Sequence, residues 1–244
     1  MYTMLKDIMC CPSVSGRENS VAEKIKSYIA PLTDESYIDP LGNLIAVKYG
    51  NGKEGEKKKV MLCGHMDEIG FLITYIEDNG FLRIAPVGGI NYVASAFTEV
   101  VSENGVHGVF VPESGTAASD LKGEKMYIDI GAKNRKEAER KVKIGDFFVV
   151  APYAKRLMGT RVFGRPFDDR VGCAILIEIA KEVKDDKNDI YYVFSVQEEV
   201  GCRGARPAGF SIAPDIAIAF DVTGTGDAQG SKPMAVKLGG GAAI

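Results

Sequence analysis

The stretch Val60-Met61-Leu62-Cys63-Gly64-His65-Met66-Asp67 is an apolar run that stops at a histidine and an aspartate. Two later runs have the same form: residues 190–196 lead to Gln197-Glu198-Glu199, and residues 216–220 lead to Asp221. Continuous apolar runs of this length are typical of strands covered on both faces, as in a parallel sheet between helices. Because binding sites in such sheets lie beyond the carboxyl ends of the strands, we expect these polar side chains to gather at one edge.

Two helices are predicted beside these strands. Val21, Ile25 and Ile29 follow helical spacing behind Ser15-Gly16-Arg17-Glu18, a capping-box pattern. Residues 170–183 are apolar nearly all round, which predicts a helix buried against the sheet. The fold class is therefore α/β, with a sheet flanked by helices.

Residues 69–157 differ in texture and predict an inserted, β-rich domain. Short alternating strands are separated there by turn signals such as Asp78-Asn79-Gly80, and one helix is predicted over 134–141. The chain then divides into a first catalytic part, residues 1–68, the insert, and a second catalytic part, residues 158–244.

Composition and charge exclude several classes of protein. The 244 residues are 45% hydrophobic and 26% charged, which is typical of a globular protein and not of a disordered one. A net charge of -3 offers no basic surface for nucleic acid. No apolar stretch reaches transmembrane length, so we expect no membrane partner. The five cysteines include no C-x-x-C pair, and Cys63, Cys173 and Cys202 lie in apolar or small-residue segments. These three are expected to be buried, reduced thiols, so a cytoplasmic location is expected.

The residues at the strand ends indicate a metal-dependent hydrolase. His65 and Asp67 face the same way because they are two residues apart in a strand, so Asp67 can orient a metal-binding His65. Glu198 and Glu199 would repel each other and lose solvation at the tip of a buried strand unless a cation offsets both costs. One would then bind metal while the other accepts a proton from water. Two accidental acids in a solvated loop are the alternative.

Three more aspartates belong to the predicted site. Asp168 and Asp169 precede the predicted buried helix, so either can cap it, while Asp168 could instead bridge two cations. Asp221 alone would be explained as a turn residue after a strand. Two divalent cations about 3.5–4 Å apart can lower the pKa of a shared water toward roughly 7 and polarise a carbonyl. Zinc, cobalt and manganese all suit such ligands.

In order along the chain, the motifs resemble one known family. They are G-H-M-D-E-I-G-F at 64–71, F-D-D-R-V-G-C at 167–173, Q-E-E-V-G-C-R-G-A at 197–205 and D-V-T at 221–223. Together they are similar to the tetrahedral (TET) aminopeptidases, di-metal glutamyl, leucyl and deblocking enzymes also labelled cellulase M or endoglucanase. The resemblance implies a zinc-exopeptidase-like sheet and an insert that forms dimers, which assemble into a hollow homo-oligomeric dodecamer that acts on short peptides.

The resemblance also implies roles for the site residues. Glu198 would be the general base, and Asp67 would be the catalytic acid behind His65. Asp168 would be joined to Asp169, a residue behind the metal ligands, by a cis peptide. The cofactors would be two divalent ions, zinc or cobalt with manganese as a third choice. The implied ligands are His65 and Asp221 for one ion, Glu199 for the other, and Asp168 between both.

One ligand of the family pattern is not matched in this sequence. The resemblance implies a further histidine ligand past Ile244, and the only other histidine of the chain is His107. His107 follows Asn104-Gly105 in the insert and is expected on a hairpin surface. We therefore expect a fragment that is poorly active and marginally stable by itself.

Three functions are weighed on these residues. A metal-dependent aminopeptidase that cleaves the first peptide bond of short peptides is the prediction. A glycoside hydrolase would need two carboxylates about 5–10 Å apart around a sugar, and the chain has no tryptophan for an aromatic platform. A non-catalytic assembly subunit would fit the unmatched histidine, although the retained Glu198 argues against it.

Overall fold

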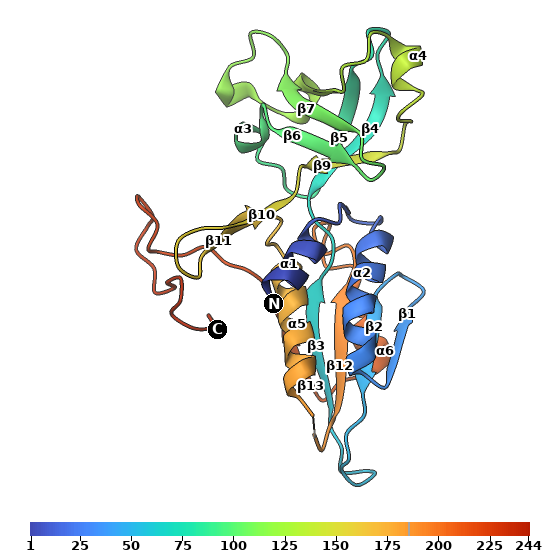
Figure 1. Ribbon diagram of the computed structural model, residues 1–244, viewed down its shortest axis with the longest axis vertical. Helices are drawn as coiled ribbons and strands as arrows, with labels where there is room; N and C mark the ends of the chain where they lie inside the picture. Colours follow the sequence, from blue (N-terminus) through green and yellow to red (C-terminus); the bar gives the residue numbers. More distant parts are fainter. Residues whose placement is uncertain (185) are drawn as a thin grey trace.

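The computed structural model describes residues 1–184 and 186–244. It contains a five-stranded sheet with helices on both faces and, beyond one end of that sheet, a closed barrel (Figure 1). The sheet has the order β1-β2-β12-β3-β13, and the barrel has the order β4-β5-β8-β7-β6-β9. The α/β fold with a β-rich part in the middle of the chain is confirmed.

The three predicted apolar runs are parallel neighbours in the sheet. Ser195 lies opposite His65, and Ala219 lies opposite Cys63, so the runs end at the same edge. β1 and β2 form an antiparallel pair, and β2 is also antiparallel to β12. The strands are β1 (Glu35–Ile38), β2 (Leu44–Lys48), β3 (Lys59–His65), β12 (Asp189–Ser195) and β13 (Ile216–Ala219).

Helices cover the two faces of the sheet unequally. Side chains alternate along β2, so Leu44 and Ala46 belong to the core under three helices, whereas Ile45 and Val47 face the opposite side. The first face carries α1, α2 and α5, and α6 covers the second (Figure 1). These helices are α1 (Tyr2–Met9), α2 (Asn19–Ile29), which is followed by the 3-10 turn η1 (Ala30–Leu32), α5 (Arg170–Glu182) and α6 (Ala205–Ile212).

Two expectations from the sequence are wrong. The predicted capping box does not cap α2, which begins at Asn19 without a side-chain cap, because Ser15 and Glu18 bind other parts of the chain. The apolar run that forms β13 is not covered on both faces. Ile216 and Ile218 are 52% and 47% exposed, because β13 is an edge strand paired with β3 alone among the described residues.

The barrel has a core of its own, in which Phe71, Phe110 and Phe148 are fully buried. Its first and last strands pair with each other, Phe71 opposite Phe148. Its strands are β4 (Gly70–Ile76), β5 (Leu82–Val87), β6 (Glu99–Ser102), β7 (His107–Pro112), β8 (Met126–Asp129) and β9 (Phe147–Val150). Short helical turns lie between them: α3 (Tyr92–Ser95), η2 (Ala118–Asp120), η3 (Gly123–Lys125) and α4 (Arg135–Ala138).

Two details of the barrel match the sequence analysis. α4 lies within the helix predicted over 134–141. His107 is exposed on the β6–β7 hairpin, where its Nδ1 lies 2.7 Å from a carboxylate oxygen of Glu99. The surface position predicted for His107 is therefore confirmed.

A hairpin leads from the barrel back to the helices. It consists of β10 (Tyr153–Arg156) and β11 (Val162–Arg165) and packs against α1. The Tyr2 hydroxyl donates to the Ala154 carbonyl, and Ala154 is part of the core beneath the three helices. Within residues 1–184 and 186–244, no helix combines the length and apolarity that a membrane crossing requires.

Candidate metal centre

The edge of the sheet where the parallel strands end holds one imidazole and two carboxylates in ligand range. His65 ends β3, Asp168 precedes α5, and Asp221 follows β13. One ligand atom of each lies within 4.8 Å of those of the other two, with His65 buried and both aspartates exposed. Nitrogen and oxygen donors grouped in this way suit a divalent cation.

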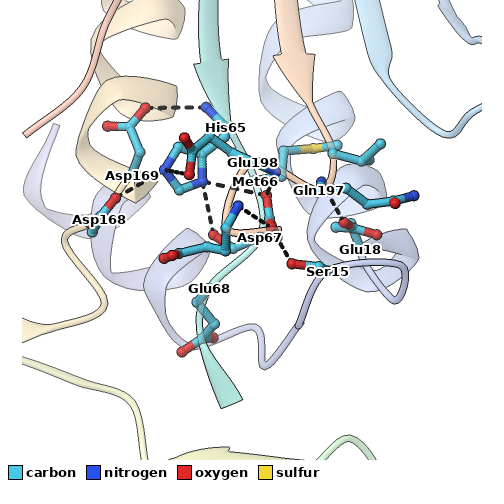
Figure 2. Close-up of polar contacts among 12 residues, drawn as sticks. Ser15, Glu18, His65, Met66, Asp67, Glu68, Asp168, Asp169, Gln197 and Glu198 are labelled. Carbon is cyan, nitrogen blue, oxygen red and sulfur yellow. Dashed lines mark hydrogen bonds and ion pairs between the residues drawn. The ribbon is translucent and has the colours of Figure 1, made fainter. Parts of the chain in front are cut away.

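The ring of His65 is fixed through both nitrogens. Its Nδ1 lies 3.1 Å from the main-chain carbonyl of Asp67, and its Nε2 lies 2.9 Å from Oδ1 of Asp168 (Figure 2). Burial lowers the pKa of His65, but the hydrogen bonds with Asp168 and Asp67 outweigh burial and raise it to about 11. The metal-free protein therefore holds a proton where a cation would otherwise bind.

Asp168 and Asp169 have different positions although they are adjacent. Asp169 is fully buried and caps α5, because its carboxylate accepts hydrogen bonds from the main-chain N–H of Gly172 (3.0 Å) and of His65 (3.2 Å). Asp168 faces His65 instead. The peptide bond between the two aspartates is cis, as the family resemblance implies. The sequence left open which of the two aspartates caps α5, and in the structure it is Asp169.

Glu198 and Glu199 follow β12 and reach the centre to different extents. Oε2 of Glu198 lies 3.9 Å from Nε2 of His65, while its Oε1 accepts a hydrogen bond from the thiol of Cys202 at 3.2 Å. The carboxylate of Glu199 does not join the group formed by His65 and the two aspartates. Burial, and next the charge of Asp168, raise the pKa of Glu199 to about 7.

Two acids of the centre, Asp169 and Glu199, have raised pKa values although the charge of His65 lowers both. Burial raises the pKa of Asp169 to about 7, like that of Glu199. The positive charge of His65 opposes this shift, and the negative charge of Asp221 adds to it. Carboxylates with pKa values raised in this way are held in a site where a cation would offset both burial and mutual repulsion. The residues present therefore fit a bound cation.

Asp67 links His65 to the segment that carries the two glutamates. Its Oδ1 lies 3.4 Å from Nδ1 of His65. The same carboxylate accepts hydrogen bonds from the N–H of Glu198 (3.0 Å), the N–H of Glu199 (3.2 Å) and the hydroxyl of Ser15 (2.6 Å) (Figure 2). Asp67 is fully buried, so its carboxylate is shielded from water although its partners are partly exposed.

The sequence analysis missed the residues that support this centre. They are Ser15, Glu18, Asn43, Glu68 and Arg170. Glu68 and Arg170 are buried and form an ion pair, Nη2 to Oε1 at 3.3 Å. Both belong to the motifs at 64–71 and 167–173 and follow the aspartates there, but no role was assigned to them. Ser15 and Glu18 had a signal too, but it was interpreted as a helix cap.

Comparison with known proteins identifies the family. Residues 42–244 match the M42 glutamyl aminopeptidase family. A putative aminopeptidase of Acetivibrio thermocellus is 48% identical over 245 residues, which cover 100% of this chain and 72% of that protein. This match agrees with the predicted peptidase and not with a glycoside hydrolase.

Solved structures agree with the sequence match. An aminopeptidase of the archaeon Desulfurococcus kamchatkensis superposes with a TM-score of 0.88 at 32% identity, over 94% of this chain and 64% of that one. The TET1 peptidase of Pyrococcus horikoshii, which can assemble into a tetrahedron or a large octahedral shell, gives 0.80 at 34% identity, over 93% and 72%. This chain thus spans between 64% and 72% of these three relatives. It belongs to the M42 glutamyl aminopeptidase family, whose members are metal-dependent peptidases.

Proposed function

We propose that this chain carries the centre of a two-metal aminopeptidase that hydrolyses the first peptide bond of short peptides. One observation supports this above all: His65, Asp168 and Asp221 place ligand atoms within 4.8 Å of one another, at an edge of the sheet that Glu198 also reaches. These residues come from segments far apart in the sequence, and family membership agrees with them.

The two ions proposed are zinc or cobalt, with manganese as the alternative. Bound there, they would polarise the scissile carbonyl and make a nearby water more acidic. The raised pKa values of Asp169 and Glu199 support a cationic occupant. Burial disfavours the charged form of both carboxylates, and a bound cation would stabilise that form. The proposed ligands are His65, Asp168, Glu199 and Asp221.

Glu198 is the proposed general base. Its Oε1 is occupied by the thiol of Cys202, so Oε2, which points toward His65, is the oxygen free to take a proton from water. Asp67 is the proposed acid behind His65. It holds the imidazole on one side and the N–H groups of Glu198 and Glu199 on the other, so it fixes the base relative to the ligands.

Self-association and location complete the proposal. The TET1 relative assembles into closed shells, and we extend this to dimers of the present chain made through the barrel, and from them to a dodecamer. Such a shell would admit only short peptides. The five cysteines of the chain are free thiols, which supports a reducing, cytoplasmic compartment. Cys63 and Cys173 are buried as expected, whereas Cys202 is exposed, contrary to the expectation.

Two matched variants test the proposed roles. Glu198→Gln should lower kcat on leucyl- or glutamyl-p-nitroanilide by about 10²–10⁴-fold, because the base is lost, while metal content stays unchanged. Glu199→Gln should lose activity together with one bound ion. Metal analysis and steady-state kinetics measure both.

The alternatives give different results in the same experiment. Full activity in Glu198→Gln would exclude it as the base. A wild-type chain that binds one ion or none and cleaves no peptide would favour a non-catalytic relative. Hydrolysis of cellulose in EDTA would support a glycosidase.

A further inference from the structure

The segment that carries the two glutamates is held by side chains and not by a neighbouring strand. Four consecutive main-chain N–H groups, those of residues 196–199, each donate to a side-chain oxygen. The acceptors are Asn43 Oδ1 for Val196 (2.9 Å), Glu18 Oε1 for Gln197 (3.0 Å), Asp67 Oδ1 for Glu198 (3.0 Å) and Asp67 Oδ2 for Glu199 (3.2 Å).

This arrangement replaces the sheet at the point where β12 ends. Gln197 has a φ of 56°, so the chain turns away from the strand direction there. A buried N–H left without an acceptor costs about 1–3 kcal/mol. The three acceptor residues are themselves buried, Glu18 to 5% exposure and the other two to 0%. The N–H groups of residues 196–199 therefore depend on these three side chains, while the carbonyls of residues 196–198 accept main-chain bonds from residues 201–204.

Glu18 is the acceptor whose hydrogen bonds, among the described residues, all come from main-chain N–H groups. Asn43 also binds Asp39 and the carbonyl of Gly204, and Asp67 also contacts His65. Glu18 uses one oxygen, Oε1, to accept from the N–H of Gln197 (Figure 2). The same oxygen accepts from the N–H of Gly16 at 2.9 Å. Burial of a carboxylate costs free energy. The N–H groups of Gly16 and Gln197 offset this cost, and Gln197 directly precedes Glu198.

Ser15 adds a second contact from the same short segment. Its hydroxyl donates to Asp67 at 2.6 Å, and Asp67 binds the next two N–H groups along the loop. The segment from Ser15 to Glu18 thus holds residues 197–199 at both ends, directly at Gln197 and through Asp67 beyond it.

We propose that Glu18 is a positioning residue, which acts through the main-chain N–H of Gln197 to hold Glu198 and Glu199 in place. The roles of the two glutamates rest on the proposed function, whereas the contact of Glu18 with the loop does not. The inference therefore predicts effects on loop protection and metal affinity as well as on turnover.

Three variants of the full chain separate positioning from general stability. Glu18→Ala removes the acceptor. Glu18→Gln keeps a carbonyl oxygen that can accept the same N–H groups and loses only the charge. Glu23→Ala changes an exposed glutamate in α2, the helix that begins directly after Glu18, and serves as control.

Hydrogen exchange gives the first measurement. In the wild-type chain the N–H groups of 197–199 should be protected, and Glu18→Ala should speed their exchange at least about tenfold, while peptides from the barrel are unchanged. Exchange that is already fast in the wild type would overturn the inference, even if Glu18→Ala failed to fold.

Zinc titration and kinetics give the second. Loss of a residue that supports metal ligands typically lowers metal affinity or activity about 10–100-fold. We expect Glu18→Ala to lower the affinity for the more weakly bound ion by about that factor. Its kcat should fall by a similar factor while its KM changes little. Glu18→Gln should stay within about threefold of wild type. Equal losses in Glu18→Ala and Glu18→Gln, or none in either, would refute a positioning role. If the wild-type chain cleaves nothing but the exchange and affinity effects appear, the proposed function fails and this inference stands.

Discussion

Arg170 lies entirely inside the protein and holds together segments that carry the proposed ligands. Its guanidinium group donates to the carbonyls of Ile8 and Cys11, to the hydroxyl of Ser13 and to the carboxylate of Glu68. Glu68 directly follows Asp67, and Arg170 directly follows Asp169. The ion pair therefore fixes the distance between the end of β3 and the start of α5.

Arg170→Met should destabilise the protein by about 3–5 kcal/mol, because the buried Glu68 loses one of its two cationic partners. Only Arg165 would then remain beside its carboxylate. Urea unfolding followed by circular dichroism measures this. Lys181→Met, which breaks an exposed pair with Glu178, is the control and should cost at most about 1 kcal/mol. Equal costs for the two variants would contradict the structural role given to Arg170.

At the scale of elements, β3 and α5 meet through glycines beside the capping carboxylate. A Cβ atom on Gly64 would lie 3.0 Å from Oδ2 of Asp169, and one on Gly172 would overlap both oxygens of that carboxylate. Asp169 can therefore cap α5 and bind the N–H of His65 only because neither position has a side chain.

Gly172→Ala should destabilise the protein by about 1–3 kcal/mol through overpacking, although alanine is the better helix former. Gly209→Ala in α6 is a matched control with open space, since the nearest atom to its Cβ would be 4.0 Å away. It should stabilise by about 0.5–1 kcal/mol. Thermal unfolding of both variants checks the pair, and a gain in stability for Gly172→Ala would refute the close contact.

Elements whose pattern is local could be predicted from the sequence, and those fixed by tertiary contacts could not. β3, β12 and α5 were predicted because each is a long apolar run that can be recognised from its own residues alone. The exposure of β13 depends on its place at the sheet edge, which no local pattern contains. Ser15 and Glu18 were misread because a capping box and a buried loop contact use the same side-chain oxygens.

The site shows the same division. The motifs indicated which residues would meet, and His65, Asp168, Asp221 and Glu198 do converge. Neither spacing nor composition could tell which of the two adjacent aspartates caps α5, because both precede the helix. Asn43 was missed because it lies in a turn far from every motif, and only folding brings it to Val196.

For the molecule as a whole, stability should depend on pH in a way that bound metal changes. In the metal-free protein the pKa values of Asp169 and Glu199 are raised to about 7 from ordinary values of 3.8 and 4.5. Between about pH 4 and pH 7 these two carboxyl groups bind more protons in the folded state than in the unfolded state. The free energy of unfolding therefore falls as pH rises through this range. His65, with a pKa of about 11 against 6.5, acts in the same direction above pH 6.5.

We therefore expect EDTA-treated protein to have a higher Tm at pH 5.5 than at pH 8. Saturating zinc should raise Tm more at pH 8, because cations bind deprotonated carboxylates and neutral imidazole. Differential scanning calorimetry at both pH values measures this. His107→Gln should leave the pattern unchanged, since His107 is exposed on the barrel. A metal-free protein that gains stability toward pH 8 would contradict the pKa shifts.

We propose that residues 69–151 form an independent unit, shorter than the span 69–157, because Ala154 packs in the core under the helices. This unit has its own aromatic core, so the excised polypeptide should fold by itself and unfold cooperatively on heating, as its near-ultraviolet circular dichroism would show. A spectrum without fixed aromatic signals would refute this.

The pairing of Phe71 with Phe148 brings the two ends of that unit side by side. A protein engineer could therefore exchange it for a different module with closely spaced termini, or open the chain there to make a circular permutant, without stretching either connection.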